Sequence, residues 1–257
     1  MKHNTMYGFP ISSIFFQICG IVIIILSLII TLLLGIYIVF IFTIFLAFLF
    51  WFLFIYHFKK KFLKDREKII IKMKQCTKVN GSEYILDLGT GAGYNAVNFS
   101  KLLKSGKVFG VDKFDKDSNV INFNFFEELK INFFGNTLNQ AKKNMIIEKQ
   151  KDKIFLIKSD LKNNFPFLNN SFDIVMSSQF LYCIPTRNLN DILNEIDRIL
   201  KPSGKIVFFE SKSFLNWNIG HIKVFFDNMN YSTSIFSFEK MPNKCVFCGQ
   251  KPHSDDK

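Results

Sequence analysis

The sequence predicts an α/β domain with a mostly parallel sheet covered on both faces, preceded by an α-helical transmembrane hairpin. Apolar strand-like runs alternate with helical patterns over roughly the last 180 residues, which is enough chain for one domain with a substantial core. A glycine-rich turn follows the first of these runs. Before them, the 46 residues from Ile11 to Tyr56 carry no charge.

The uncharged N-terminal run predicts two membrane spans. A single helix of this length would measure about 70 Å, whereas a hydrocarbon core is ~30 Å thick. Spans near Ile11–Thr31 and Ile36–Tyr56, joined by a turn around Leu32–Gly35, fit better than one span with a buried extension. A cleaved signal peptide is not expected, because the run is too long and no small-residue cleavage site follows it.

Basic residues follow the uncharged run. The segment Lys59–Lys78 holds nine basic and two acidic residues, a net charge of +7 out of +12 for the chain. Positive charge beside a span marks the cytosolic side, so both termini and the α/β domain are expected in the cytosol. The segment is expected to attract anionic lipid headgroups. Nucleic acid is not an expected partner, because stacking aromatic residues other than Phe62 are absent from it.

The chain therefore divides into five predicted parts. These are an N-terminal tail over 1–10, two transmembrane helices within 11–58, a basic juxtamembrane linker over 59–80, the α/β domain over 81–250 and a C-terminal tail over 251–257.

The glycine-rich turn is the most specific motif of the α/β domain. The apolar residues of Tyr84–Leu86 end at Asp87, and Gly89, Gly91 and Gly93 precede a helical pattern. Glycines let the backbone bend sharply and let a ligand approach it, which predicts a nucleotide-like cofactor site at the end of a first strand. The spacing G-x-G-x-G departs from the dinucleotide fingerprint, and the acid suits a cationic ligand better than a pyrophosphate.

Four further strands are predicted along the chain, each with a polar residue near its end. Asp112 lies nineteen positions after Gly93, where a carboxylate can accept hydrogen bonds from a ribose diol. The strands are Lys107–Asp112, Ile154–Lys158 followed by Ser159 and Asp160, Ser171–Ser177, and Leu200–Glu210.

Helices are expected between and after these strands. Arg187–Leu200 has the clearest three-four apolar repeat and stops before Pro202 and Gly204. Other expected helices are Asn136–Lys149 and Ser213–Asn228, and the expected closing strands are Ser232–Lys240 and Lys244–Cys248, joined by a turn at Pro242-Asn243. The aromatic stretch Phe114–Phe134 is compatible with a helix over the cofactor or a flap facing lipid.

The succession of these segments, over roughly Gly81–Gly249, resembles the class I S-adenosylmethionine-dependent methyltransferases, with a domain of the type-11 or type-25 kind. The whole layout resembles a group of membrane-tethered members. The resemblance implies a Rossmann-like doubly wound, seven-stranded sheet whose last two strands form an antiparallel hairpin, and S-adenosyl-L-methionine as cofactor. The implied cofactor-binding residues are Asp87, Gly89, Thr90, Gly91, Gly93, Asp112, Asp160, Leu161 and Ser177.

The implied activity is methyl transfer to a small or lipid-like acceptor at the cytosolic face of a membrane. The enzyme must hold a nucleophile in line with an already electrophilic methyl group and exclude water. Tyr182 and Glu210 are candidate catalytic residues. The sequence Ser177–Phe180 lacks the Asn/Asp-Pro-Pro-aromatic motif of amine methylators, so exocyclic amine methylation is not expected. An NAD(P)-dependent oxidoreductase and a catalytically inactive, membrane-anchored binding module are the alternatives.

The five cysteines are scattered and odd in number, which predicts no disulfide framework. Cys245 and Cys248, with His253 beyond them, lack a convincing second pair of ligands, so no metal site is expected.

Overall fold

The computed structural model describes residues 21–30 apart from 23 and 27, and residues 37–114, 137–161, 165–214 and 217–253. The chain forms two compact units, with their boundary between Lys68 and Ile69. The first predicted span and the following turn lie largely outside the described residues, as does most of the aromatic stretch Phe114–Phe134.

Helix α2 (Tyr37–Thr77) runs without interruption for 41 residues. It covers both the second predicted span and most of the predicted linker, since no glycine or proline breaks it. Large apolar side chains such as Phe42 and Phe50 are exposed along its first part. Among the described residues, however, no helix combines the length and the apolarity that a membrane span requires, so the expected transmembrane hairpin is not found there.

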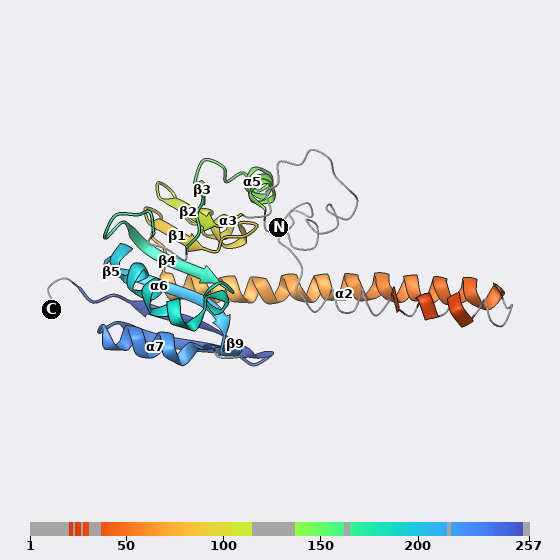
Figure 1. Ribbon diagram of the computed structural model, residues 1–257. Coiled ribbons are helices and arrows are strands. Elements are labelled where there is room, and N and C mark those ends of the chain that lie inside the picture. The colour runs from red at the N-terminus through yellow and green to blue at the C-terminus, as the bar shows by residue number, and fades with distance from the viewer. Residues whose placement is uncertain are drawn as a thin grey trace. The chain divides into compact units, whose positions relative to one another are not determined.

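The second unit is built on a seven-stranded sheet with the order β3-β2-β1-β4-β5-β9-β8 (Figure 1). The first five strands in the sequence pair in parallel, and β9 and β8 complete the sheet as an antiparallel hairpin. The strands are β1 (Tyr84–Leu88), β2 (Lys107–Asp112), β3 (Ile154–Lys158), β4 (Phe172–Ser178), β5 (Leu200–Ser211), β8 (Ser232–Phe238) and β9 (Met241–Gln250).

Helices cover both faces of this sheet, as the sequence predicts. Alternate residues of each strand serve opposite faces: Ile85 belongs to one core cluster and Leu86 to the other. The helices α6 and α7 pack on the face of Leu86, and the last turns of α2, with α3 and α5, pack on the face of Ile85. These helices are α3 (Tyr94–Ser100), α5 (Leu138–Ile147), α6 (Thr186–Ile199) and α7 (Ile219–Asn228).

Two local expectations differ from the structure. Only the second half of Ser213–Asn228 is helical, because Asn218 caps α7 with its side chain and the short strands β6 (Ser213–Phe214) and β7 (Trp217–Asn218) precede it. The turn of the closing hairpin is not at Pro242-Asn243. Strand β9 begins at Met241, so Glu239 and Lys240 make the turn.

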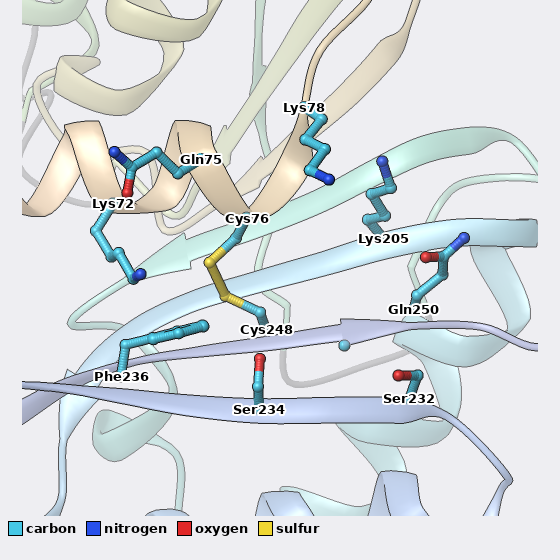
Figure 2. Close-up of a pocket in the computed structure, with 11 residues that line it drawn as sticks. Lys72, Gln75, Cys76, Lys78, Lys205, Ser232, Ser234, Phe236, Cys248 and Gln250 are labelled. Carbon is cyan, nitrogen blue, oxygen red and sulfur yellow. A yellow bond between two sulfur atoms is a disulfide. The ribbon is translucent and has the colours of Figure 1, made fainter.

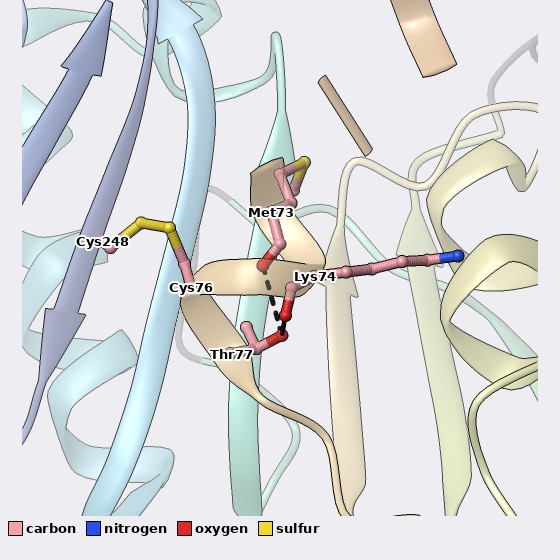
Figure 3. Close-up of a disulfide and its surroundings, with 5 residues drawn as sticks. All are labelled: Met73, Lys74, Cys76, Thr77 and Cys248. Carbon is pink, nitrogen blue, oxygen red and sulfur yellow. Dashed lines mark hydrogen bonds between the residues drawn. A yellow bond between two sulfur atoms is a disulfide. The ribbon is translucent and has the colours of Figure 1, made fainter. Parts of the chain in front are cut away.

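The end of α2 belongs to the core of the α/β unit rather than to a free linker. Ile70 and Met73 are buried against the sheet, and the hydroxyl of Thr77 donates to the carbonyl oxygens of Met73 and Lys74, both at 3.2 Å (Figure 3). The helix therefore ends on the sheet itself.

A disulfide joins Cys76 of α2 to Cys248 of β9, with their Cα atoms 6.2 Å apart (Figure 3). The sequence analysis expected no disulfide framework and did not foresee this single bond, because 172 positions separate the two residues and only the packing of α2 against the sheet brings them together. Cys245 remains a free, buried thiol. Among the residues that the structure describes, no group of side chains is arranged to hold a metal ion.

We predict that the double substitution Cys76→Ser/Cys248→Ser lowers the free energy of unfolding by about 2–5 kcal/mol, because the bond closes a long loop in the unfolded chain. Urea unfolding of the full chain measures this difference, with Cys245→Ser as the control. An equal stability of the double variant and the oxidised wild type would contradict the prediction.

Candidate functional site

The turn after β1 lies at the carboxyl ends of the parallel strands, where the strand order reverses between β1 and β4. In open α/β sheets this switch point is the usual place for a ligand. The turn bends through left-handed backbone conformations at Gly89, Gly91 and Gly93, with φ angles of 67°, 52° and 79°. The N–H groups of Gly89 and Thr90 donate to the carbonyl oxygen of Val111, at 2.9 and 3.0 Å, which ties the turn to β2.

At two positions near this turn only glycine fits, because a side chain would collide with a neighbouring residue. A Cβ atom on Gly89 would lie 2.6 Å from the ring of Phe180, and one on Gly110 of β2 would lie 2.8 Å from Oγ1 of Thr90. Phe180 thus packs directly on the glycine turn from the loop after β4. The sequence analysis assigned no role to Phe180 or Gly110, because both contacts join segments far apart in the chain.

Asp87 holds the turn together from inside. Its Oδ2 atom accepts hydrogen bonds from the hydroxyl of Thr90 at 2.7 Å and from the N–H of Ala96 in α3 at 3.2 Å. Its Oδ1 atom is buried and, among the described residues, has no hydrogen-bond partner. Burial raises the pKa of this carboxyl to about 7, although the hydrogen bonds counteract part of the effect. An uncompensated buried carboxylate oxygen is suited to a cationic ligand group.

Asp112 lies across the same turn at the end of β2. Its Oδ2 atom accepts from the N–H of Gly91 at 2.8 Å, so its carboxylate borders the glycine turn. Asp160, after β3, is exposed and lies 3.6 Å from the Nζ atom of Lys113, while Leu161 is buried. The ends of β1, β2 and β3 thus bring Asp87, Asp112 and Asp160 to one edge of the sheet.

Glu210 closes the other side of the switch point. It is fully buried, and its Oε1 atom accepts from the N–H groups of Phe180 at 3.0 Å and Leu181 at 2.9 Å. The hydroxyl of Ser177, which is also buried, lies 3.4 Å from the same oxygen. Burial raises the pKa of Glu210 to about 7, although these N–H donors lower it in part. Glu210 therefore positions the loop that carries Phe180, and Ser177 contacts Glu210.

Tyr182 lies in the short helix η1 (Leu181–Cys183), with its ring partly buried against the core that includes α6 and α7. The structure thus brings both candidate catalytic residues to the loop after β4. Glu210 accepts hydrogen bonds from backbone N–H groups of that loop, and Tyr182 is part of the loop.

Comparison with known proteins agrees with this geometry. Residues 86–208 match the model of a protein family described as a methyltransferase domain. This match, over just under half of the chain, supports a class I S-adenosylmethionine-dependent methyltransferase domain. The matched segment begins in β1 and ends in β5, so it includes the glycine turn, Asp112, Asp160 and the loop of Phe180.

The methyltransferase domain is also similar to curated proteins and to solved structures. A probable methyltransferase, ltbC, from Aspergillus luteorubrus is 25% identical over 127 residues, which are 49% of this chain and 39% of that protein. The chain spans less than half the length of the curated relatives that it matches. A methyltransferase from Aquifex aeolicus has a TM-score of 0.50 at 17% identity, over 72% of this chain and 88% of its own. The [4+2]-cyclase SpnF has a TM-score of 0.54 at 14% identity, over 73% and 81%.

The cofactor of the methyltransferase domain is S-adenosyl-L-methionine, and the residues present fit it. The glycine turn exposes backbone without side chains, the free Oδ1 atom of Asp87 suits the ammonium group of the cofactor, and the carboxylate of Asp112 suits its ribose. The remaining predicted contacts, Thr90, Leu161 and Ser177, are buried. Individual contacts of these residues with the cofactor stay predictions.

We predict that the stability of the folded protein falls as the pH rises from about 4.5 to 7, in part through Glu210. Between these pH values Glu210 loses its proton in the unfolded chain but keeps it in the folded protein. Above about pH 7 the carboxyl is ionised in both states. The contribution is at most about 3 kcal/mol. Urea unfolding at several pH values should show a weaker decline for Glu210→Gln. The exposed Glu239→Gln is the control, and an unchanged decline in Glu210→Gln would refute the prediction.

Proposed function

We propose that this chain transfers the methyl group of S-adenosyl-L-methionine to a small or lipid-like acceptor beside a membrane. The single observation that supports methyl transfer most strongly is the acid-capped glycine turn, with a free, buried oxygen on Asp87, inside a segment that matches a methyltransferase domain. The alternative, an NAD(P)-dependent oxidoreductase, is less well supported at this turn, because a buried carboxylate repels the pyrophosphate of NAD(P).

The cofactor, when bound, supplies an electrophilic methyl group. The residues of this chain hold the turn and the loop that surround the cofactor site in a fixed position. Asp87 fixes the glycine turn to α3, and Asp112 fixes it to the end of β2. Glu210 fixes the facing loop, so Phe180 packs against Gly89. Holding reactants in a fixed geometry accounts for several kcal/mol of the barrier, up to ~7–11 in the best models.

We propose a positioning role for Glu210 through its Oε1 atom, which accepts from backbone N–H groups of the facing loop. Its Oε2 atom is buried and has no hydrogen-bond partner among the described residues, so a role as base stays a prediction. Tyr182, which is only partly buried, remains the proposed residue for contact with the acceptor.

The membrane part of the proposal rests on the N-terminal unit. The described apolar side chains between Ile41 and Tyr56 are mostly exposed, and a solvent-exposed apolar surface of this length marks a partner surface. The basic segment Lys59–Lys78 follows directly. The disulfide Cys76–Cys248 bears on the compartment, since such bonds are rare in the cytosol. The cytosolic location therefore stays a prediction, as does binding of anionic headgroups.

We predict that binding of S-adenosyl-L-methionine to the full chain at pH 7 releases about half a proton, because a cation beside Asp87 lowers a pKa that lies near 7 in the free protein. Calorimetry in buffers of different ionisation enthalpy measures the release. Asp87→Asn should abolish it and weaken binding about tenfold, and Asp112→Ala should weaken binding without abolishing the release.

The exposed Asp152→Asn is the matched control for these variants. Equal proton release by wild type and Asp87→Asn would remove the role of Asp87. Binding of NADH in place of S-adenosyl-L-methionine would favour the oxidoreductase.

We also predict that cells expressing the chain incorporate labelled methyl groups into a small or lipid-like product, in the membrane fraction. Asp112→Ala should lose most of this labelling, because it weakens cofactor binding. Chromatography of extracted lipids and small molecules identifies the product. Cofactor binding without any labelled product would favour the inactive binding module, and activity in the soluble fraction alone would contradict the membrane location.

A further inference from the structure

A basic cavity lies within the α/β unit at the far end of the sheet from the glycine turn (Figure 2). It is bordered by the last turns of α2, the beginning of β5, the beginning of β8 and the end of β9. Its volume is about 270 Å³, and it is open to solvent. The lining residues are Lys72, Gln75, Cys76, Lys78, Lys205, Ser232, Ser234, Phe236, Cys248, Gly249 and Gln250.

The lining combines three ammonium groups with neutral donors and contains no carboxylate among the described residues. Lys72, Lys78 and Lys205 take part in none of the ion pairs found in the described part of the chain. In Figure 2 the side chains of Lys78 and Lys205 extend into the same region, from the end of α2 and from β5. Like charges at such a place repel, and a bound anion would relieve the repulsion.

The contacts of these lysines leave donors available. The Nζ atom of Lys205 donates to the carbonyl oxygen of Thr77 at 2.7 Å, and an ammonium group has three N–H donors. The Nζ atom of Lys72 lies 3.5 Å from the ring centroid of Phe236, which orients the charge without neutralising it. Lys78 adopts a left-handed conformation, with φ 48°, just beyond the end of α2.

Carbonyl oxygens at the end of a helix would oppose an anion, but here several are already engaged. The carbonyl of Met73 accepts from the hydroxyl of Thr77, that of Lys74 accepts from the N–H of Lys78, and that of Thr77 accepts from Lys205. On the opposite wall, Ser232 and Ser234 lie two positions apart in β8 and so share one face of the strand.

We propose that this cavity binds a phosphate group beside Lys78 and Lys205, with the hydroxyl of Ser232, while Lys72 and Ser234 border the same cavity farther along and add positive charge and a further donor. Several amine and hydroxyl donors around one cavity match the many acceptor oxygens of a phosphate. A second cavity of about 400 Å³ shares Ser232 and Gln250 with it, so space exists for the organic part of a phosphate ester. The site is separate from the methyl-donor turn and does not depend on the proposed activity.

The first arm of the test titrates inorganic phosphate into the full chain at constant ionic strength and follows its thermal stability. We expect phosphate to stabilise the wild type more than chloride does. Lys72→Gln/Lys78→Gln should weaken phosphate binding by at least about tenfold. The control, Lys142→Gln/Lys143→Gln, removes the same charge from exposed positions of α5.

The second arm compares sedimentation with vesicles of phosphatidylcholine alone and of phosphatidylcholine with phosphatidic acid. A preference for phosphatidic acid that only Lys72→Gln/Lys78→Gln loses identifies a lipid headgroup as the source of the phosphate. Phosphate binding together with an equal lipid preference in both double variants identifies a soluble phosphate compound.

Binding of S-adenosyl-L-methionine by each variant confirms that it is folded, and Ser234→Ala provides a second, uncharged substitution that should also weaken phosphate binding. The proposal is overturned if phosphate acts no differently from chloride on the wild type, or if the two double variants bind it equally.

Discussion

The methyltransferase domain depends on one buried carboxylate, that of Asp87 at the end of β1. One of its oxygens joins the glycine turn to the beginning of α3 through Thr90 and Ala96. A buried acid without these donors would be strongly unfavourable, and with them its pKa still lies near 7. Its Oδ1 atom lacks a hydrogen-bond partner among the described residues. The same oxygen is what makes the turn suited to a cation.

Glu210 mirrors this arrangement on the other side of the switch point. It too is a fully buried acid at a strand end, with its pKa raised to about 7, and it too holds a loop through backbone N–H groups. The two loops meet where Phe180 packs against Gly89. The cofactor turn and the loop that faces it are therefore coupled through direct contact. Glu210 is thus connected to the glycine turn through the loop of Phe180.

The end of α2 links the N-terminal helix with the α/β core. Its last turns bury Ile70 and Met73 in that core, and Cys76 bonds to β9. The same turns carry Lys72 and Lys78, which form part of the basic cavity. The sequence analysis identified this segment only by its positive charge. In the structure its end packs into the core, is joined to β9 by a disulfide and lines the basic cavity. The carbonyl oxygens of its last turn are engaged by Thr77, Lys78 and Lys205.

Local patterns in the amino-acid sequence were enough to predict several elements of this protein. The apolar runs predicted β2 and β3 to the residue, and the three-four repeat predicted α6 within one position, because both signals come from neighbours in the chain. The acid and glycines after β1 indicated the methyl-donor turn for the same reason. Tertiary structure alone decided the contact of Phe180 with Gly89, the backbone donors that occupy Glu210, the disulfide of Cys76 and the cavity of Lys72, Lys78 and Lys205. Each of these joins segments separated by many residues, and no local periodicity records which strands and helices a folded sheet brings together.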